Sequence, residues 1–388
     1  MKNNYHISDK VSNFLNFLRW ISAFLVLIAH LRSVIFVGAK DAGSLNVFWK
    51  AFYLLTDFGY QAVMVFFVLS GFLVGSSILK RAKNNNLSFI NYLLYDRGVR
   101  IYIVLIPAIT LTAFLDIYGL TNFDKIGVYT GNLELSSLSY SVANRLGLDI
   151  FLGNLLMLQG SIVPTFGSNF PLWSLAYEVW YYILFFSIVS ILSKKHIFAK
   201  FIYLNIIILS IFLLNINIIL YFSIWLLGVL IWFVYKKIKI NKYFVFTLFF
   251  VFLMMNRLHI FIVENRFLID FLFSATIAML IMLVMQNKIA IYNSFINKFL
   301  SNFSYSLYLT HFPLLLFILT YLNYSYDFNI RVKPSLEYLG YFVIIFILVS
   351  SISYLFYFFT EKNTKKIQNY LQNKNKTKKR AIVIKYKK

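Results

Sequence analysis

Ten long apolar stretches dominate the sequence and leave little room for a soluble fold. Each is close to the roughly 20 residues that a helix needs to cross the hydrocarbon core of a bilayer. Of the 388 residues, 60% are hydrophobic and 13% are charged, whereas a soluble domain is about half apolar and about a quarter charged. This composition excludes a soluble enzyme, a disordered chain and a nucleic-acid-binding domain. We predict an all-α polytopic membrane helix bundle with about ten transmembrane helices, over residues 14–37, 59–79, 98–119, 172–193, 198–217, 218–235, 243–258, 267–286, 302–321 and 336–359.

The positions of lysine and arginine predict how these helices are oriented. Cytoplasmic loops of membrane proteins carry an excess of both residues. If both termini are cytoplasmic and the short apolar segment 146–160 is re-entrant or interfacial, 28 of the 37 basic residues fall on the cytoplasmic side. We therefore expect a membrane domain over 1–361 and a basic cytoplasmic tail over 362–388. The tail should be solvated and lie near anionic lipid.

Ionisable residues inside the apolar stretches are informative, because burying one in a membrane costs at least about 2.5 kcal/mol. Arg19 and His30 are eleven residues apart, close to three helical turns, so they share one face of the first helix. His30 is either a core histidine or a proton-transfer group, because imidazole exchanges its proton near neutral pH. Glu178 should lie at a similar depth in the fourth helix. It is either a structural anchor or a carboxylate that orients His30 and stabilises its charged form.

For other polar residues at or inside the predicted helices, a functional and a structural role are both considered. Arg97 and Arg100 are three residues apart, so they project from one helix face at the predicted cytoplasmic end. Two guanidinium groups in this arrangement can bind phosphate oxygens, or they can be ordinary flanking residues. Ser70 lies among small residues, and we favour helix packing over a hydroxyl in a cavity. His311 is a second intramembrane histidine, for which packing and function are evenly matched.

Several kinds of site are excluded by the residues. The chain has no Cys, which rules out disulfides, thiolate metal sites and a cysteine nucleophile. The sequence contains no metal-ligand spacing, phosphate-binding glycine loop, nucleophile elbow or dinucleotide fingerprint. We therefore expect no metal site, no permanently bound cofactor and no nucleic-acid partner.

Five motifs on successive apolar stretches resemble the acyltransferase 3 family of multi-pass membrane acyltransferases. They are Arg19-x10-His30, F-F-V-L-S-G-F at 66–72, R-x-x-R-I-Y at 97–102, W-S-L-A-Y-E-V-W-Y-Y at 173–182 and S-Y-S-L-Y-L-T-H at 304–311. The resemblance covers roughly residues 14–359. The periplasmic SGNH-type domain of some family members is not expected here.

The resemblance implies O-acylation, most often O-acetylation, of a surface glycan or a lipid-linked sugar at the bacterial plasma membrane. The implied acyl donor is cytoplasmic acetyl-CoA, whose phosphates Arg97 and Arg100 would hold and whose path Arg19 would line. His30 would act as general base or form a transient acetyl-imidazole, and Glu178 would fix its ring. The substrate pocket would be shaped by Ser70, Trp173, Tyr308 and His311.

A transporter of polysaccharide or of a lipid-linked sugar is the alternative, because it too would have many spans and buried polar groups. Such a transporter is expected to contain repeats with broken helices, and the sequence shows no repeat. A purely structural membrane protein would leave the buried His, Glu and Arg residues without a role.

Overall fold

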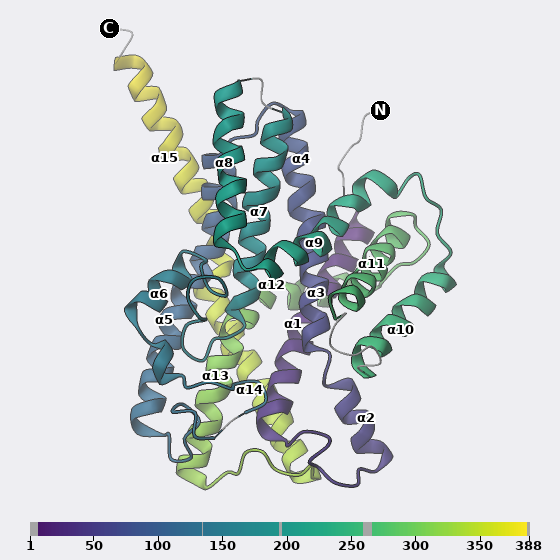
Figure 1. Cartoon of the computed structure of the whole chain (residues 1–388), viewed down its shortest axis with the longest axis vertical. Coiled ribbons are helices and arrows are strands. Elements are labelled where there is room, and N and C mark those ends of the chain that lie inside the picture. The colour runs from purple at the N-terminus through teal and green to yellow at the C-terminus, as the bar shows by residue number, and fades with distance from the viewer. Residues whose placement is uncertain (1–6, 134, 194–195, 259–265, 386–388) are drawn as a thin grey trace.

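The structure is a bundle of α-helices, seen in a computed structural model that describes residues 7–133, 135–193, 196–258 and 266–385 (Figure 1). No β-strand occurs among these residues, so the predicted all-α class is confirmed. The ten predicted stretches correspond to α1 (Asp9–Ile35), α3 (Gly59–Ser70) with η1 (Gly71–Gly75) and α4 (Ser76–Lys83), α5 (Val99–Asn122), α7 (Leu172–Ser193), α8 (Ile197–Leu213), α9 (Ile216–Val234), α10 (Lys242–Leu258), α11 (Arg266–Met285), α13 (Ser304–Tyr326) and α14 (Leu336–Phe359). The shorter elements are α2 (Val47–Leu55), η2 (Ile90–Gly98), η3 (Ala143–Arg145), α6 (Leu148–Leu155), α12 (Ser294–Asn302) and η5 (Glu361–Asn363), and the tail forms α15 (Thr364–Lys385).

Eight helical segments of the described chain are long and apolar enough to cross a membrane. Helices α8 and α10 have 17 residues each, which corresponds to about 25 Å and falls short of the ~30 Å hydrocarbon core. Helix α8 ends before the predicted stretch does, because Asn215 starts α9 by accepting a hydrogen bond from the N–H of Asn217 at 2.9 Å. All ten predicted stretches are therefore helical, but two of them are shorter than a full crossing.

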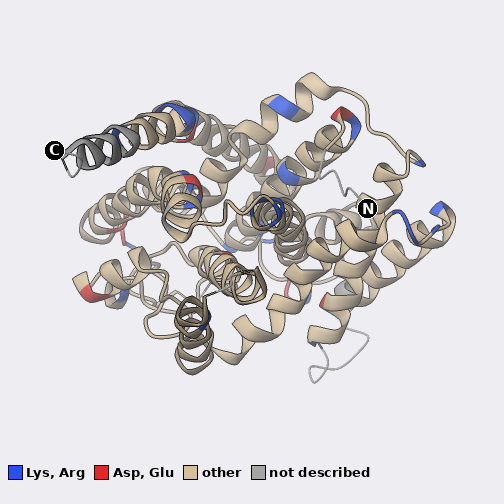
Figure 2. Cartoon of the chain, turned by 90° about the horizontal axis from the view of Figure 1, so that it is seen from above, with Lys and Arg blue, Asp and Glu red and all other residues tan. Residues whose placement is uncertain are grey.

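The amino end of α1 and helix α15 lie toward the same end of the bundle, the upper end in Figure 1. Seen from that end, Lys and Arg are more frequent along the ribbon than Asp and Glu (Figure 2). This arrangement agrees with the excess of basic residues that a cytoplasmic face carries. That this end faces the cytoplasm stays a prediction.

The described residues between α5 and α7 contain no helix long enough to cross a membrane. Helix α6 in this segment has eight residues, far fewer than the roughly 20 needed to span a bilayer. Around it the chain forms turns, including one in which Met157 adopts the left-handed conformation at φ 59°. This geometry fits the predicted re-entrant or interfacial character of residues 146–160.

The end of this segment is fixed deep inside the bundle by hydrogen bonds from buried side chains. Asp116 on α5 accepts from the backbone N–H of Ser168 at 2.6 Å and from its hydroxyl at 2.7 Å. Asn169 donates to Thr112 on α5 at 3.0 Å and to the carbonyl of Leu309 on α13 at 2.8 Å. Because buried polar groups are costly unless paired, these bonds fix where α7 begins. Helix α7 therefore starts between α5 and α13 rather than at the surface of the bundle.

The continuous segment of α3 and η1 touches α9 through the backbone at two glycines. A Cβ atom on Gly71 would lie 1.9 Å from the carbonyl oxygen of Trp225, and one on Gly228 would lie 2.1 Å from that of Val68. The chain continues from Gly71 as the π-helical turn η1, a form often found at functional sites. The small residues of this stretch therefore serve helix packing, as their sequence suggested.

We expect Gly71→Ala to destabilise the protein, because the new methyl group must displace backbone. Overpacking a well-packed interior typically costs about 1–3 kcal/mol. The thermal unfolding midpoint of the purified protein in detergent should fall clearly. Gly340→Ala is the matched control, since nothing lies within 4 Å of a Cβ atom there. Equal midpoints for the two variants would contradict this packing.

The basic tail is a helix whose first turns lie against the bundle, contrary to the solvated tail expected from the sequence. Gln368 donates to the backbone carbonyl of Asp96 at 2.6 Å, and Gln372 donates to its carboxylate at 2.8 Å. Arg81 also pairs with the Asp96 carboxylate. Asp96 belongs to η2, so one carboxylate joins α4, η2 and α15. The sequence did not predict this contact, because Gln368 and Gln372 lie in a stretch rich in lysine and asparagine, and such a stretch is typical of a solvated tail.

Asp96→Ala should loosen the start of α15, because it removes the acceptor shared by Arg81 and Gln372. We expect faster amide hydrogen exchange over residues 364–374, measured by mass spectrometry in a detergent or a nanodisc. Lys374→Ala, at an exposed position of the same helix, should leave exchange unchanged. An unaltered exchange rate in Asp96→Ala would mean that apolar packing alone holds the tail.

Candidate active site

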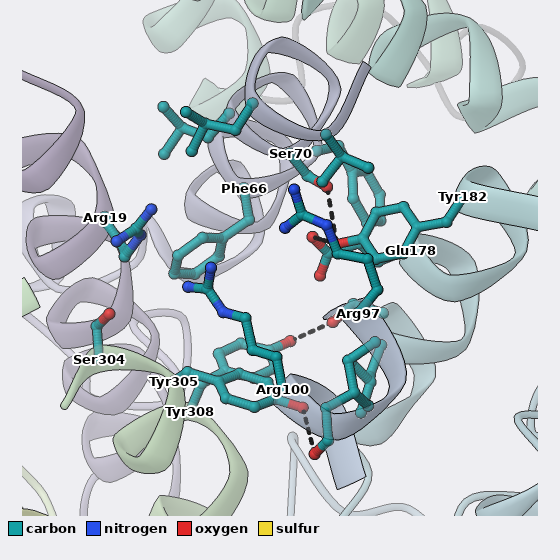
Figure 3. A pocket seen from close by; sticks show the side chains of 17 residues that line it. Arg19, Phe66, Ser70, Arg97, Arg100, Glu178, Tyr182, Ser304, Tyr305 and Tyr308 are labelled. Atoms are coloured by element: carbon teal, nitrogen blue, oxygen red, sulfur yellow. Dashed lines mark hydrogen bonds between the residues drawn. The ribbon is translucent and has the colours of Figure 1, made fainter. Parts of the chain in front are cut away.

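A cavity of about 350 Å³ lies inside the bundle, between α1, α3 with η1, α5, α7 and α13 (Figure 3). Apolar side chains of α3 and η1 form one wall, to which α3 adds the hydroxyl of Ser70, and the other polar side chains come from α1, η2, α5, α7 and α13. The charged and hydroxyl-bearing residues of its lining are Arg19, Ser70, Arg97, Arg100, Ser174, Glu178, Tyr182, Ser304, Tyr305 and Tyr308. The volume is at the lower end of the range for ligand pockets.

Three arginines from three segments make the cavity positive. Arg19 comes from α1, Arg97 from the π-helix η2 and Arg100 from the first turn of α5. Tyr92 holds Arg97, because its hydroxyl accepts from Nε at 3.1 Å and its ring centre lies 5.5 Å from the guanidinium carbon. The predicted common face of Arg97 and Arg100 is confirmed, and Arg19 joins them. Glu178 is the acidic residue of the lining, so positive charge is in excess.

Glu178 is held by a chain of hydrogen bonds that crosses three helices. Trp225 Nε1 donates to the hydroxyl of Ser70 at 3.1 Å, and that hydroxyl donates to the Tyr182 oxygen at 3.1 Å. Tyr182 in turn donates to Glu178 Oε1. In all three hydrogen bonds the donor lies on the side away from the carboxylate, so each hydrogen bond strengthens the next one in the chain. Ser70 therefore does more than allow helix packing: its hydroxyl lines the cavity and supports the carboxylate.

The two intramembrane histidines pair with each other. His30 Nδ1 lies 2.8 Å from His311 Nε2. The ring of Phe170 packs 4.8 Å from the His30 ring and that of Phe312 packs 5.4 Å from it, measured between centroids. Neither histidine belongs to the cavity lining. The histidine pair is therefore a second polar cluster, separate from the arginine-lined cavity.

Tyr308 lies between the cavity and the histidine pair. Its hydroxyl, in the cavity wall, is 2.6 Å from the hydroxyl of Ser174 and donates to the carbonyl of Pro171 at 3.2 Å. Its backbone carbonyl accepts from His311 Nδ1 at 2.8 Å. One residue of α13 thus contacts both clusters.

The expected pairing of His30 with Glu178 does not form. Ser174 and Tyr308 mark one level of α7 and α13, and the two helices lead away from it toward opposite ends of the bundle. Glu178 is four residues along α7 and His311 three residues along α13, so about 10 Å of rise separates them. Glu178 instead bonds Tyr182 and lies beside Arg97 in Figure 3.

The family model described as "Acyltransferase domain", that of the acyltransferase 3 family, matches residues 12–358, nearly the whole chain. The chain belongs to the acyltransferase 3 family. Searches among curated proteins and among solved structures returned no match. The family assignment makes this multi-helical membrane protein an acyltransferase.

Two residues predicted to shape the substrate pocket of this acyltransferase lie elsewhere. Trp173 is absent from the cavity lining, since its ring packs against Tyr177, with centroids 5.0 Å apart, and against Phe67, with centroids 6.2 Å apart. His311 bonds His30 and is only 1% exposed. The other predicted pocket residues, Ser70 and Tyr308, do line the cavity.

The site also contains residues that the sequence did not single out. Tyr182 and Trp225 support Glu178, but an aromatic residue in an apolar stretch gives no signal of such a role. Glu361 in η5 accepts from the backbone N–H and the hydroxyl of Ser306 at 3.2 and 3.0 Å. Its carboxylate lies within electrostatic range of Arg100 and Arg19. Its position at the end of the last apolar stretch, where basic residues dominate, was the available signal.

No group of three or more His, Cys, Asp or Glu side chains in the described parts of the chain is placed to hold a metal ion. What the arrangement offers instead is an anion site and an imidazole pair. Guanidinium groups bind phosphate oxygens through paired N–H donors, and imidazole accepts or gives a proton near neutral pH.

Proposed function

We propose that this acyltransferase moves an acyl group, an acetyl group by preference, from cytoplasmic acyl-CoA to a hydroxyl of a surface glycan or of a lipid-linked sugar. It would do so in the bacterial plasma membrane. The observation that supports the proposal best is the cavity in which Arg19, Arg97 and Arg100 converge from three segments. In a member of the acyltransferase 3 family, such a site suits the phosphates of a CoA thioester.

The donor would enter from the end of the bundle where α15 lies. Arg97 and Arg100 stand at the start of the α5 segment, at that end, so they are placed to meet the phosphates first. Phosphate bound by two guanidinium groups gains charge-assisted hydrogen bonds, which are about twice as strong as neutral ones. The thioester arm would then occupy the cavity, whose apolar wall along α3 and η1 suits an uncharged chain.

His30 is the proposed general base. It would take the proton of the acceptor hydroxyl while the hydroxyl oxygen attacks the carbonyl carbon of the thioester. The carbon–sulfur bond then breaks, an ester forms, and CoA leaves as a thiolate that takes up a proton. General base catalysis contributes about 10²–10⁴-fold in typical enzymes. Glu178 stays a proposed catalytic residue, acting within the donor cavity beside Arg97 instead of on the imidazole.

Turnover can be measured directly, because the chain contains no Cys. A thiol reagent added to the purified protein in nanodiscs therefore reports only the CoA that is released. We expect release from acetyl-CoA to depend on an added glycan or lipid-linked sugar and to be slower with longer acyl-CoAs. NMR of the acceptor should show a new O-acetyl signal. Sugar movement across the membrane without CoA release would instead support the transporter.

A further inference from the structure

The two histidine rings meet edge to edge in one plane. Their planes differ by 6° and their centroids are 5.1 Å apart, while the facing nitrogens are 2.8 Å apart. Stacked rings would not bring two nitrogens this close while keeping the centroids so far apart. The lone pair and the N–H bond of an imidazole lie in the ring plane, so the contact is an aligned hydrogen bond. One nitrogen must donate and the other must accept.

The surroundings of His311 decide which nitrogen donates. His311 Nδ1 lies 2.8 Å from the carbonyl oxygen of Tyr308 and 3.1 Å from that of Leu307. A carbonyl oxygen can only accept, so Nδ1 carries a hydrogen. In a neutral imidazole the other nitrogen then has the lone pair. His311 Nε2 is therefore the acceptor, and His30 Nδ1 is the donor.

A charged His311 would reverse this assignment, but its environment disfavours the charge. The ring is 1% exposed, and its recorded partners among the described residues are two carbonyls and a second imidazole, none of which is negative. Burying a charge without a counter-charge is costly. The charged group that acts on His30 is Arg32, a cation paired with Asp57, so it supplies no counter-charge for a second cation here. The neutral pair is the arrangement that these contacts support.

We propose that His311 is a positioning residue that holds His30 in the tautomer with a free lone pair on Nε2. With Nδ1–H committed to His311, the lone pair on Nε2 can accept the proton of an acceptor hydroxyl. His311 does not touch either substrate in this role. Phe170 and Phe312 pack against the His30 ring at steep angles, and their rings limit its rotation. The inference rests on the proposed function only in treating His30 as the base.

The tautomer can be measured without any turnover. Nitrogen-15 NMR of histidine-labelled protein in nanodiscs reports which ring nitrogen carries hydrogen, and His30→Gln identifies the His30 signals among the five histidines. We expect His30 to show a protonated Nδ1 and an unprotonated Nε2. In His311→Leu the acceptor is gone, and the hydrogen should shift toward Nε2. A wild-type His30 protonated on Nε2 overturns the proposal whatever the activity.

Kinetic measurements then show whether His311 positions the His30 ring or only fills space beside it. His311→Leu should lower kcat by about 100-fold, within the range for losing general base catalysis, with the KM for acetyl-CoA unchanged because neither histidine lines the cavity. His311→Gln, whose amide oxygen can accept from His30, should recover at least a tenth of wild-type kcat. Thr310→Val removes the neighbouring buried hydroxyl that contacts Ser353 and Ser306 and should leave kcat unchanged.

The outcomes distinguish the positioning role of His311 from the proposed acyl transfer. Equal losses in His311→Gln and His311→Leu, with unchanged unfolding midpoints, would overturn a hydrogen-bonding role for His311. A wild-type protein that shows the expected tautomer but releases no CoA from any acyl donor would refute the acyltransferase mechanism and leave the hydrogen-bond assignment standing.

Discussion

His30→Ala should lower the rate of acyl transfer by about 10²–10⁴-fold, the contribution usually made by a general base. The variant loses the imidazole that the proposed mechanism uses to take the acceptor proton. Its KM for acetyl-CoA should stay close to the wild-type value, because His30 is not part of the arginine-lined cavity. The measurement is CoA release in nanodiscs, followed by NMR of the modified acceptor.

Two controls make the His30 result interpretable. His196→Ala changes an exposed histidine at the start of α8 and should have wild-type activity. The unfolding midpoint of His30→Ala shows whether the variant keeps its fold. Wild-type acyl transfer by a folded His30→Ala protein would remove His30 from the mechanism.

Arg97→Ala should raise the KM for acetyl-CoA by about 10- to 150-fold. A hydrogen bond to a charged group is worth about 1.5–3 kcal/mol, and every 1.4 kcal/mol is a factor of ten in affinity. The arginine lies in the cavity with its Nε bonded to Tyr92, so its other guanidinium nitrogens are left to meet phosphate. Little change in kcat is expected at saturating donor.

A donor without phosphates provides the matched comparison. Acetyl-pantetheine carries the same thioester arm but none of the phosphates, so Arg97→Ala and the wild type should use it at similar rates. Arg145→Ala is a second control, because Arg145 lies outside the cavity lining with its guanidinium over the ring of Tyr140. If Arg97→Ala changed both donors equally, the arginine would serve the cavity's shape and not phosphate binding.

The charged residues of the arginine-lined cavity could be found from the sequence, because ionisable groups are costly to bury in a membrane. Arg19, Arg97, Arg100 and Glu178 are ionisable groups in or beside apolar stretches, where each needs a partner or a function. The structure gathers all four around one cavity. Helical periodicity was sufficient for the pair at 97 and 100, since three residues return to the same face of a helix.

The partner of His30 could not be found in the same way. Depth was inferred by counting residues from the ends of apolar stretches, which assumes that α7 starts at the membrane surface. In fact Ser168 and Asn169 anchor the preceding chain inside the bundle, so Glu178 lies about 10 Å of helix rise away from the histidine pair. Hydrogen bonds between residues distant in sequence set this offset, and no local pattern reports them. The sequence identified His311 as a histidine inside an apolar stretch, but it did not predict that His311 bonds His30.

The hydrogen-bond chain behind Glu178 shows a similar limit. Ser70 stands among glycines and serines, and its sequence surroundings favoured packing. Trp225 and Tyr182 stand in strongly apolar helices, where aromatic residues are ordinary. Only the close approach of the α3 and η1 segment to α9 at Gly71 and Gly228 brings the Trp225 ring to Ser70. Because this hydrogen bond depends on contact between two backbones, the sequence of neither segment alone predicts it.

Tyr308 contacts both the arginine-lined cavity and the histidine pair, and in the proposed mechanism this determines how far an acyl group has to travel. Its hydroxyl faces the chamber that the donor would fill, and its carbonyl holds the ring that supports the base. In the proposed mechanism the acyl group would not have to cross the whole bilayer, because only the side chain of Tyr308 would stand between the bound donor and the histidine pair.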